Sequence, residues 1–170
     1  MSKDELIRVG MIDFLNGVVP DYQLDLPQCE KFYGMPSVLN NRLRSGELDI
    51  SPVSSMEYLL HYANYEILPE LCIRADRRAA TVGVFSSLKP DQWHERKIYL
   101  SGASLTSVYL LKLLCKAYYK VEPLFIQQAS DRVNHENLRE VLKTNDAMLV
   151  IGDRAYKEQK TMGSDINYYD

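Results

Sequence analysis

The chain has 170 residues, 46% of them hydrophobic and 25% charged, and its formal net charge is −3. This composition is typical of a globular domain, and the near balance of charge argues against nucleic acid or an anionic membrane surface as a partner. The early acidic residues do not fit a secretory signal, and no apolar run is long enough to span a bilayer, so we expect a cytoplasmic protein. The cysteines, Cys29, Cys72 and Cys115, are far apart and predict neither a disulfide framework nor a zinc site.

Short apolar runs alternate with helical patterns along the chain. Taken in chain order, the predicted strands cover residues 6–14, 29–33, 48–53, 81–86, 97–100, 123–127 and 147–151. The predicted helices begin at Pro36, Ser54, Ser104, Asn137 and Asp153. Asn16-Gly17 predicts a turn after the first strand. Strands that alternate with helices indicate mainly parallel sheets, so the predicted fold class is α/β.

A break in the pattern occurs near the middle of the chain, at Leu88-Lys89-Pro90. Proline cannot continue a central strand or a helix interior, so the break marks a change from one structural region to another. We therefore expect two lobes, formed by residues 1–88 and 89–170.

The stretch SGASLTS joins a predicted strand to a predicted helix start. A helix N-terminus offers unpaired N–H groups and the positive end of the helix dipole, and the hydroxyls of Ser104, Thr106 and Ser107 lie in the same stretch. These features suit a carboxylate or a phosphate. An ordinary N-cap with small residues in the turn is the commoner use of such a stretch, so both interpretations stay open.

Three other stretches follow predicted strands in the same way. SPVSSMEY places Ser54 and Ser55 at a helix start, and Ser54 with Glu57 also fits a capping box. Asn16 and Asp153 each follow a strand end, where a side chain can contact a ligand but where a turn or a helix cap is the commoner role. The histidines show no metal-ligand spacing and no nucleophile partner, so we expect no metal site.

Five segments are informative in their joint order: RVGMIDFLN, LNNRLRSGELDISPVSSMEY, VFSS, LSGASLTSVYLLKLL and LVIGDRA. Together they resemble the chorismate dehydratase family of the futalosine route to menaquinone. The resemblance implies a two-lobed periplasmic-binding-protein-like fold of type 2, with a ligand cleft between the lobes. It also implies cytoplasmic dehydration of chorismate to 3-enolpyruvylbenzoate, without a metal or an organic cofactor. Family members are considerably longer, so the first lobe is expected to be incomplete here.

The resemblance also assigns two residues to catalysis. The asparagine of the family's F-L-N motif falls on Asn16. A functionally important family serine, in a loop just before the first lobe crossing, falls on Thr81. Threonine keeps the hydroxyl, but the usual glycine of that loop is missing and two arginines are present. The resemblance therefore implies that Asn16 and Thr81 contribute to turnover.

The remaining family positions concern binding of the substrate. The family's paired serines fall on Ser54 and Ser55, and its S-x-T-S helix start falls on the stretch that begins at Ser104. The expected substrate-binding residues are Ser54, Ser55, Ser104, Thr106, Ser107 and Asp153.

The expected partner is the small molecule chorismate. Two other interpretations stay open, namely a non-catalytic binding module for a small dicarboxylate and an inactive fragment of the enzyme. A polypeptide that ends at Asp170 would lack the returning strand of its first lobe, and its uncovered apolar faces would favour association into a homo-oligomer. We expect such a polypeptide to be inactive on chorismate.

Overall fold

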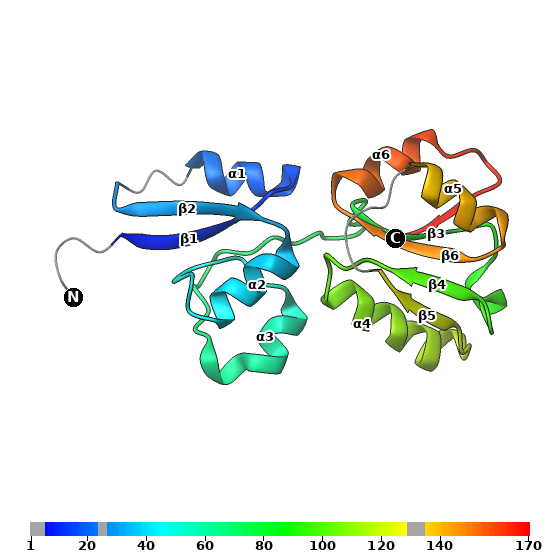
Figure 1. The fold of residues 1–170 in the computed structure, drawn as a ribbon, viewed down its shortest axis with the longest axis horizontal. Coiled ribbons are helices and arrows are strands. Elements are labelled where there is room, and N and C mark those ends of the chain that lie inside the picture. The colour runs from blue at the N-terminus through cyan, green and yellow to red at the C-terminus, as the bar shows by residue number, and fades with distance from the viewer. Residues whose placement is uncertain (1–5, 24–26, 129–134) are drawn as a thin grey trace. The chain divides into compact units, whose positions relative to one another are not determined.

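The computed structural model describes residues 6–23, 27–128 and 135–170. The chain divides into two compact units, residues 1–73 and 74–170, and each unit has its own sheet (Figure 1). Strand β3 (Val82–Ser86) pairs with strands of the second unit. The division between the units therefore lies earlier in the chain than the break at Leu88.

The first unit is a small α/β layer. Its elements are β1 (Ile7–Ile12), α1 (Leu15–Gln23), β2 (Cys29–Gly34), α2 (Pro36–Arg44), α3 (Ser55–His61) and the 3₁₀ turn η1 (Tyr62–Asn64). β1 and β2 are parallel, and Ile50 forms a parallel bridge to Val9 on the other side of β1. The segment around Ile50 therefore runs in the same direction as β1, and the two segments end at the same edge.

Helix α1 begins where the sequence predicted a turn at Asn16-Gly17. β1 ends at Ile12, two residues before the predicted end at Phe14, and a helix follows it at Leu15. A Cβ at Gly17 would lie 2.2 Å from the carbonyl oxygen of Ile12, which is far too close for any side chain. The helix can start against the end of β1 because glycine at position 17 has no side chain.

The second unit is built on a five-stranded sheet. Besides β3, its elements are the 3₁₀ turn η2 (Pro90–Gln92), β4 (Lys97–Leu100), α4 (Thr106–Leu113), the π-helical turn η3 (Leu114–Tyr119), β5 (Leu124–Gln127), α5 (His135–Lys143), β6 (Ala147–Ile151), α6 (Asp153–Thr161) and β7 (Asn167–Tyr169). The strand order is β5-β4-β6-β3-β7. β4 is parallel to β5 and β6, whereas β3 is antiparallel to β6 and β7.

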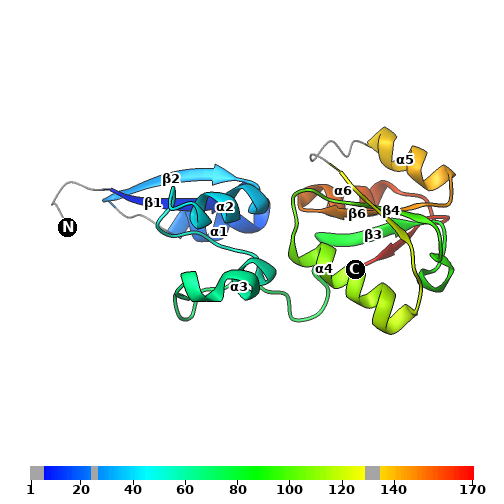
Figure 2. The ribbon, with the colours of Figure 1, turned by 60° about the horizontal axis from the view of Figure 1, so that its bottom comes forward.

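Helices cover both faces of this sheet, α4 on one face and α5 with α6 on the other (Figures 1 and 2). Successive residues of a strand point to opposite faces. Val84 and Leu149 accordingly belong to the buried cluster that contains the α4 side chains. Phe85 and Met148 belong to the cluster that contains the side chains of α5 and α6. The unbroken apolar run of β6 follows from this arrangement, because both of its faces are buried.

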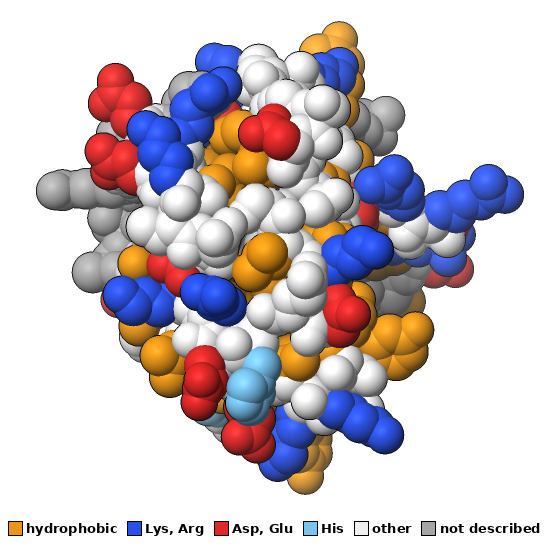
Figure 3. Space-filling model, turned by 90° about the vertical axis from the view of Figure 1, so that its right-hand side faces the viewer, with side chains coloured by type: hydrophobic (Ala, Val, Ile, Leu, Met, Phe, Trp, Pro, Cys, Tyr) orange, Lys and Arg blue, Asp and Glu red, His pale blue; other side chains and the backbone are white. Residues whose placement is uncertain are grey.

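The surface of the second unit mixes apolar and charged side chains. The large exposed apolar residues of α4 and η3 include Tyr109, Leu110, Leu113 and Tyr118. On the side drawn in Figure 3, Lys and Arg alternate with Asp and Glu, and apolar side chains show between them. Within the described ranges, no helix is long and apolar enough to cross a membrane.

Candidate functional site

Three of the predicted segments meet at one edge of the second unit's sheet. β4 and β6 are parallel neighbours, so their carboxyl ends point the same way. β3 runs antiparallel to β6, so its amino end lies beside the carboxyl end of β6. The structure thus brings Thr81, which precedes β3, to the same edge as Ser104 after β4 and Asp153 after β6.

Backbone contacts fix Thr81 beside the turn that precedes α6. The N–H of Gly152 donates to the carbonyl oxygen of Thr81 at 2.7 Å. The hydroxyl of Thr81 donates to the carbonyl oxygen of Ala79 at 3.3 Å, which is a long hydrogen bond. A ligand that accepts a hydrogen bond from the Thr81 hydroxyl therefore has to replace only this long bond to Ala79. Asp153, on the other side of Gly152, is the first residue of α6 and is half-buried.

The side chain of Ser104 binds the first turn of helix α4, one residue before the N-cap residue Leu105. Its hydroxyl oxygen accepts from the backbone N–H of Ser107 at 3.2 Å, and its hydroxyl donates to the Ser107 oxygen at 2.8 Å. The ordinary capping role that the sequence left open is therefore present. Ser107 accepts in this hydroxyl pair, which leaves its own hydroxyl proton for another acceptor. Ser104, Thr106 and Ser107 are all half-buried, so the helix start is accessible to a small ligand.

The first unit also places its predicted residues at helix starts. Asn16 lies in the first turn of α1 and Ser55 is the first residue of α3, and both are exposed. The hydroxyl oxygen of Ser54 accepts from the backbone N–H of Glu57 at 3.3 Å and from the side-chain amide of Asn40 at 3.2 Å. Ser54 therefore acts as the cap of α3, whereas the side chains of Asn16 and Ser55 are open to solvent.

The carboxylate of Glu57, in the first turn of α3, has partners that the sequence did not predict. In a capping box it would accept from the N–H of Ser54, but that N–H donates to Asn40. Glu57 is only 1% exposed, and each of its oxygens lies 3.1 Å from Nη1 of Arg44. The hydroxyl of Tyr65 donates to it at 2.8 Å. Burial, together with this bond, raises the pKa of Tyr65 to about 12.

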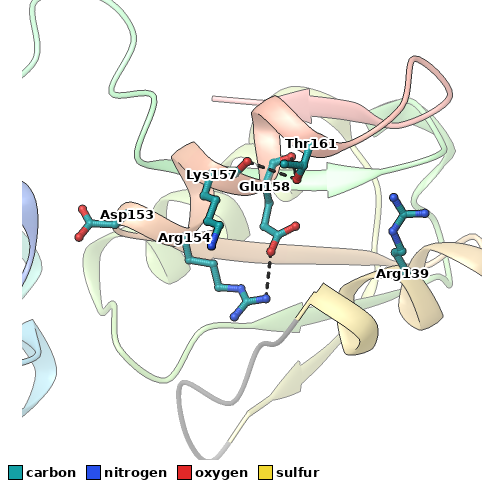
Figure 4. Close-up of a pocket in the computed structure, with 6 residues that line it drawn as sticks. All are labelled: Arg139, Asp153, Arg154, Lys157, Glu158 and Thr161. Carbon is teal, nitrogen blue, oxygen red and sulfur yellow. Dashed lines mark hydrogen bonds and ion pairs between the residues drawn. The ribbon is translucent and has the colours of Figure 1, made fainter.

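A hollow of about 760 Å³ lies along α6 and reaches Arg139 of α5. It is lined by Arg139, Asp153, Arg154, Lys157, Glu158 and Thr161. Figure 4 shows Arg154 reaching toward Glu158, at an Nη2–Oε1 distance of 3.0 Å. Asp153 is the one predicted site residue in this lining. In the part of the chain that the structure describes, no three His, Cys, Asp or Glu side chains gather closely enough to hold a metal ion.

Comparison with known sequences places residues 7–167 under a family model described as menaquinone biosynthesis. A curated chorismate dehydratase from Thermus thermophilus is 33% identical to the chain over 150 residues. These residues are 88% of this chain and 51% of that protein. The chain thus spans about half the length of this relative.

Comparison with solved structures identifies the fold. A structure from Archaeoglobus fulgidus superposes with a TM-score of 0.68 at 16% identity, and the match covers 98% of this chain and 60% of that one. The alkanesulfonate-binding protein SsuA from Xanthomonas axonopodis pv. citri, solved with bound MOPS, gives 0.56 at 16% identity and covers 100% and 62% of the two chains. Identities this low show the fold alone. The superpositions confirm the predicted periplasmic-binding-protein-like α/β fold class.

Proposed function

The chain belongs to the menaquinone biosynthesis family, and from this premise we propose that the full-length protein is a chorismate dehydratase. The observation that carries the proposal is the meeting of Thr81, Ser104 and Asp153 at one sheet edge, because ligands of open α/β sheets bind where strands end. The family resemblance supports a cytoplasmic reaction of the hydro-lyase class.

The proposed reaction removes one water molecule from the chorismate ring. A ring C–H bond and the neighbouring ring C–OH bond break, and a new ring double bond forms between the two carbons. The products are 3-enolpyruvylbenzoate and water, and the ring becomes aromatic. Aromatisation supplies the driving force, so the protein must position the substrate, stabilise developing negative charge and assist the departure of hydroxide.

The helix start at α4 suits one carboxylate of the substrate. The N-terminal end of the helix carries a partial positive charge, and the Ser107 hydroxyl keeps its proton for an acceptor. Thr81 at the same edge would donate to the ring carboxylate as that group takes up negative charge. Asp153 would accept from the ring hydroxyl, which orients the leaving group.

The family resemblance implies that the second carboxylate binds at a helix start of the first unit. Ser55 is exposed at the beginning of α3, beside the cap residue Ser54, and suits the second carboxylate. The exposed amide of Asn16 would donate to the departing hydroxide. The proton to be removed is conjugated with the ring carboxylate, so an enolate-like intermediate fits the reaction. We assign the base role to the substrate's own enolpyruvyl carboxylate.

Incubation of the full-length protein with chorismate tests the proposal. We expect an aromatic product that is lighter than chorismate by one water molecule, detected by absorbance and mass spectrometry. Calorimetric titration with the product measures binding separately from turnover. Binding of chorismate without formation of the product would instead support the alternative of a non-catalytic dicarboxylate-binding module.

The Thr106→Val variant of the same protein tests the carboxylate site at α4. It removes a hydroxyl from the helix start but keeps the shape of the side chain, so product affinity should fall by roughly 10-fold, the scale of one hydrogen bond to a charged group. The bond from the Ser107 N–H to Ser104 does not involve Thr106, and the melting temperature of the variant measures any loss of stability separately from the loss of affinity. Unchanged affinity in this variant would exclude the α4 helix start as the carboxylate site.

A further inference from the structure

The residue after β7 lies beside the segment before β3. β7 pairs antiparallel with β3, with Val84 opposite Tyr169 and Ser86 opposite Asn167. The chain therefore leaves β7 at the edge where it enters β3. Asp170 follows β7 and is thus adjacent to the loop that carries Thr81, although the two residues are far apart in the sequence.

The side chain of Asp170 binds the backbone of that loop. Its Oδ1 accepts from the N–H of Ala79 at 2.9 Å, and its Oδ2 accepts from the N–H of Ala80 at 2.7 Å. The carboxylate is 14% exposed, and Nε of the largely exposed Arg78 lies 3.7 Å from Oδ2. Hydrogen bonds to an ionised acceptor are short and about twice as strong as neutral ones, so this pair fixes the loop backbone.

The loop that Asp170 holds is an unusual one. Ala80 has a φ of 58°, in the left-handed region that residues with a side chain rarely adopt. In such a turn two successive N–H groups can point at the same anion, and here that anion is the Asp170 carboxylate. The bonds to Asp170 therefore offset part of the free-energy cost of the conformation at Ala80.

The same loop sets the direction of the Thr81 side chain. The Thr81 hydroxyl donates to the carbonyl oxygen of Ala79, the residue whose own N–H binds Asp170. On its other side the carbonyl oxygen of Thr81 accepts from Gly152. Thr81 is thus held between a fixed strand end and a turn whose shape depends on one carboxylate.

We propose that Asp170 is a positioning residue for the Thr81 hydroxyl, which it orients by holding the N–H groups of Ala79 and Ala80. This inference rests on the proposed function for the catalytic role of Thr81, but its structural part does not. A displacement of about 1 Å at a reacting group can reduce turnover 100-fold, so the loop backbone matters for the rate even though Asp170 itself does not touch the substrate.

The test uses the full-length protein and its Asp170→Asn variant, which keeps the size of the side chain but replaces one of its two acceptor oxygens with an NH₂ donor. We expect kcat on chorismate to fall by roughly 10- to 100-fold with KM within about 2-fold of the unmodified protein. Asp165→Asn is the matched control, because Asp165 precedes β7 and lies toward the opposite end of that strand. It should leave both constants unchanged.

Amide hydrogen exchange of Ala79 and Ala80 gives a readout that does not require turnover. In Asp170→Ala both amides should exchange at least about 10-fold faster, while amides in the central strand β6 keep their protection. An unchanged exchange rate, or an Asp170→Asn variant with unchanged kcat, overturns the inference. So does a variant whose melting temperature falls while kcat per folded molecule stays the same.

The same experiment separates this inference from the proposed function. If the unmodified protein does not convert chorismate at all, the proposed reaction is wrong. The exchange rates of Ala79 and Ala80 then decide whether Asp170 holds the loop. If the unmodified protein is active and the Asp170 variants match it in kcat, KM and amide exchange, the reaction stands and the positioning role falls.

Discussion

At the scale of single residues, the conformation of Ala80 leads to a stability prediction. A left-handed backbone costs roughly 1–2 kcal/mol for a residue with a Cβ but almost nothing for glycine. Ala80→Gly should therefore raise the free energy of unfolding by about 0.5–1 kcal/mol, even though glycine gains freedom in the unfolded chain. Differential scanning calorimetry should show a higher melting temperature.

Ala79→Gly serves as the neighbouring control for that change. Ala79 does not have a positive φ, so glycine there brings only the added freedom of the unfolded chain. It should lower the melting temperature. If both variants shift the melting temperature in the same direction, backbone strain at Ala80 does not explain the effect of Ala80→Gly.

Two side chains carry the prediction for catalysis. In the full-length protein, Thr81→Val and Asn16→Leu should each lower kcat by roughly 100-fold or more, the scale of losing one donor that acts in the transition state. KM should not rise in proportion, because such a donor contributes little to binding of the ground state. Steady-state kinetics with chorismate gives both constants.

Thr144→Val provides the control for the loss of a hydroxyl. Thr144 is exposed between α5 and β6, at the end of β6 opposite to Thr81, and its hydroxyl donates to the carbonyl oxygen of Val141 at 2.8 Å. It should keep normal kinetics. Near-normal turnover in both Thr81→Val and Asn16→Leu would remove these residues from the mechanism.

The sequence located residues whose role depends on near neighbours. Ser54 and Ser104 were predicted at helix starts, and both accept from an N–H three residues ahead. It did not predict the contacts of Glu57 with Arg44 or of Asp170 with Ala80. These pairs are separated by 13 and 90 residues, and no local pattern records which distant N–H group or guanidinium a carboxylate will reach.

At the scale of elements, one ion pair joins β1 to the segment that runs beside it. Asp49 accepts from the backbone N–H of Arg8 at 2.8 Å and from its guanidinium at 3.0 and 2.7 Å. These bonds to Arg8 lower the pKa of Asp49 from 3.8 to about 2. The folded state therefore favours the ionised carboxylate more strongly than the unfolded state does.

The pH dependence of this contribution follows from its sign. Because the folded pKa lies below the unfolded one, the stabilisation is complete above about pH 4 and is lost as the pH falls toward 2. Asp49→Asn should lower the urea midpoint at pH 6, and the difference from the unmodified chain should shrink as the pH approaches 2. The pair is exposed, so added salt should also reduce the difference. A difference that stays constant from pH 6 to pH 2 would contradict the assignment.

The positions of the strands were easier to predict than the pairing between them. Six of the observed strands lie within or beside predicted apolar runs. β7 was not predicted, because three residues show no measurable alternation. Helix α1 was missed because Gly17 indicates a turn locally, whereas its actual role is to let the helix start against Ile12. The predicted boundary placed β3 in the first lobe because nothing within Val82–Ser86 indicates pairing with β6.

At the scale of the whole molecule, exposed apolar side chains favour association. After α3 begins, the first unit exposes Leu59, Leu60, Tyr62, Ile67, Leu68, Leu71 and Ile73. Burial of this surface between chains is favourable by roughly 25 cal/mol for each Å² removed from water. A polypeptide of these 170 residues should therefore associate at micromolar concentrations, as measured by light scattering.

A double variant, Leu59→Glu with Leu71→Glu, should shift the same polypeptide toward the monomer, because both side chains are highly exposed and a charge there opposes burial. Lys89→Glu is a suitable control, since it changes the net charge by the same sign at an exposed polar position. A polypeptide that is already monomeric before any substitution would show that this surface does not drive association.

Trp93 gives the molecule an internal fluorescent reporter. It is the single tryptophan of the chain, and it lies in the core of the second unit with 1% of its surface exposed. Its indole N–H donates to the hydroxyl oxygen of Ser86 at 3.1 Å, and its ring meets the ring of Tyr169 edge-on at 5.5 Å. Its emission therefore responds to unfolding of the second unit and to undocking of β7. Circular dichroism, by contrast, sums the helices of both units. If the units unfold independently, the two signals separate during a urea titration, and the emission stays constant while the first unit unfolds.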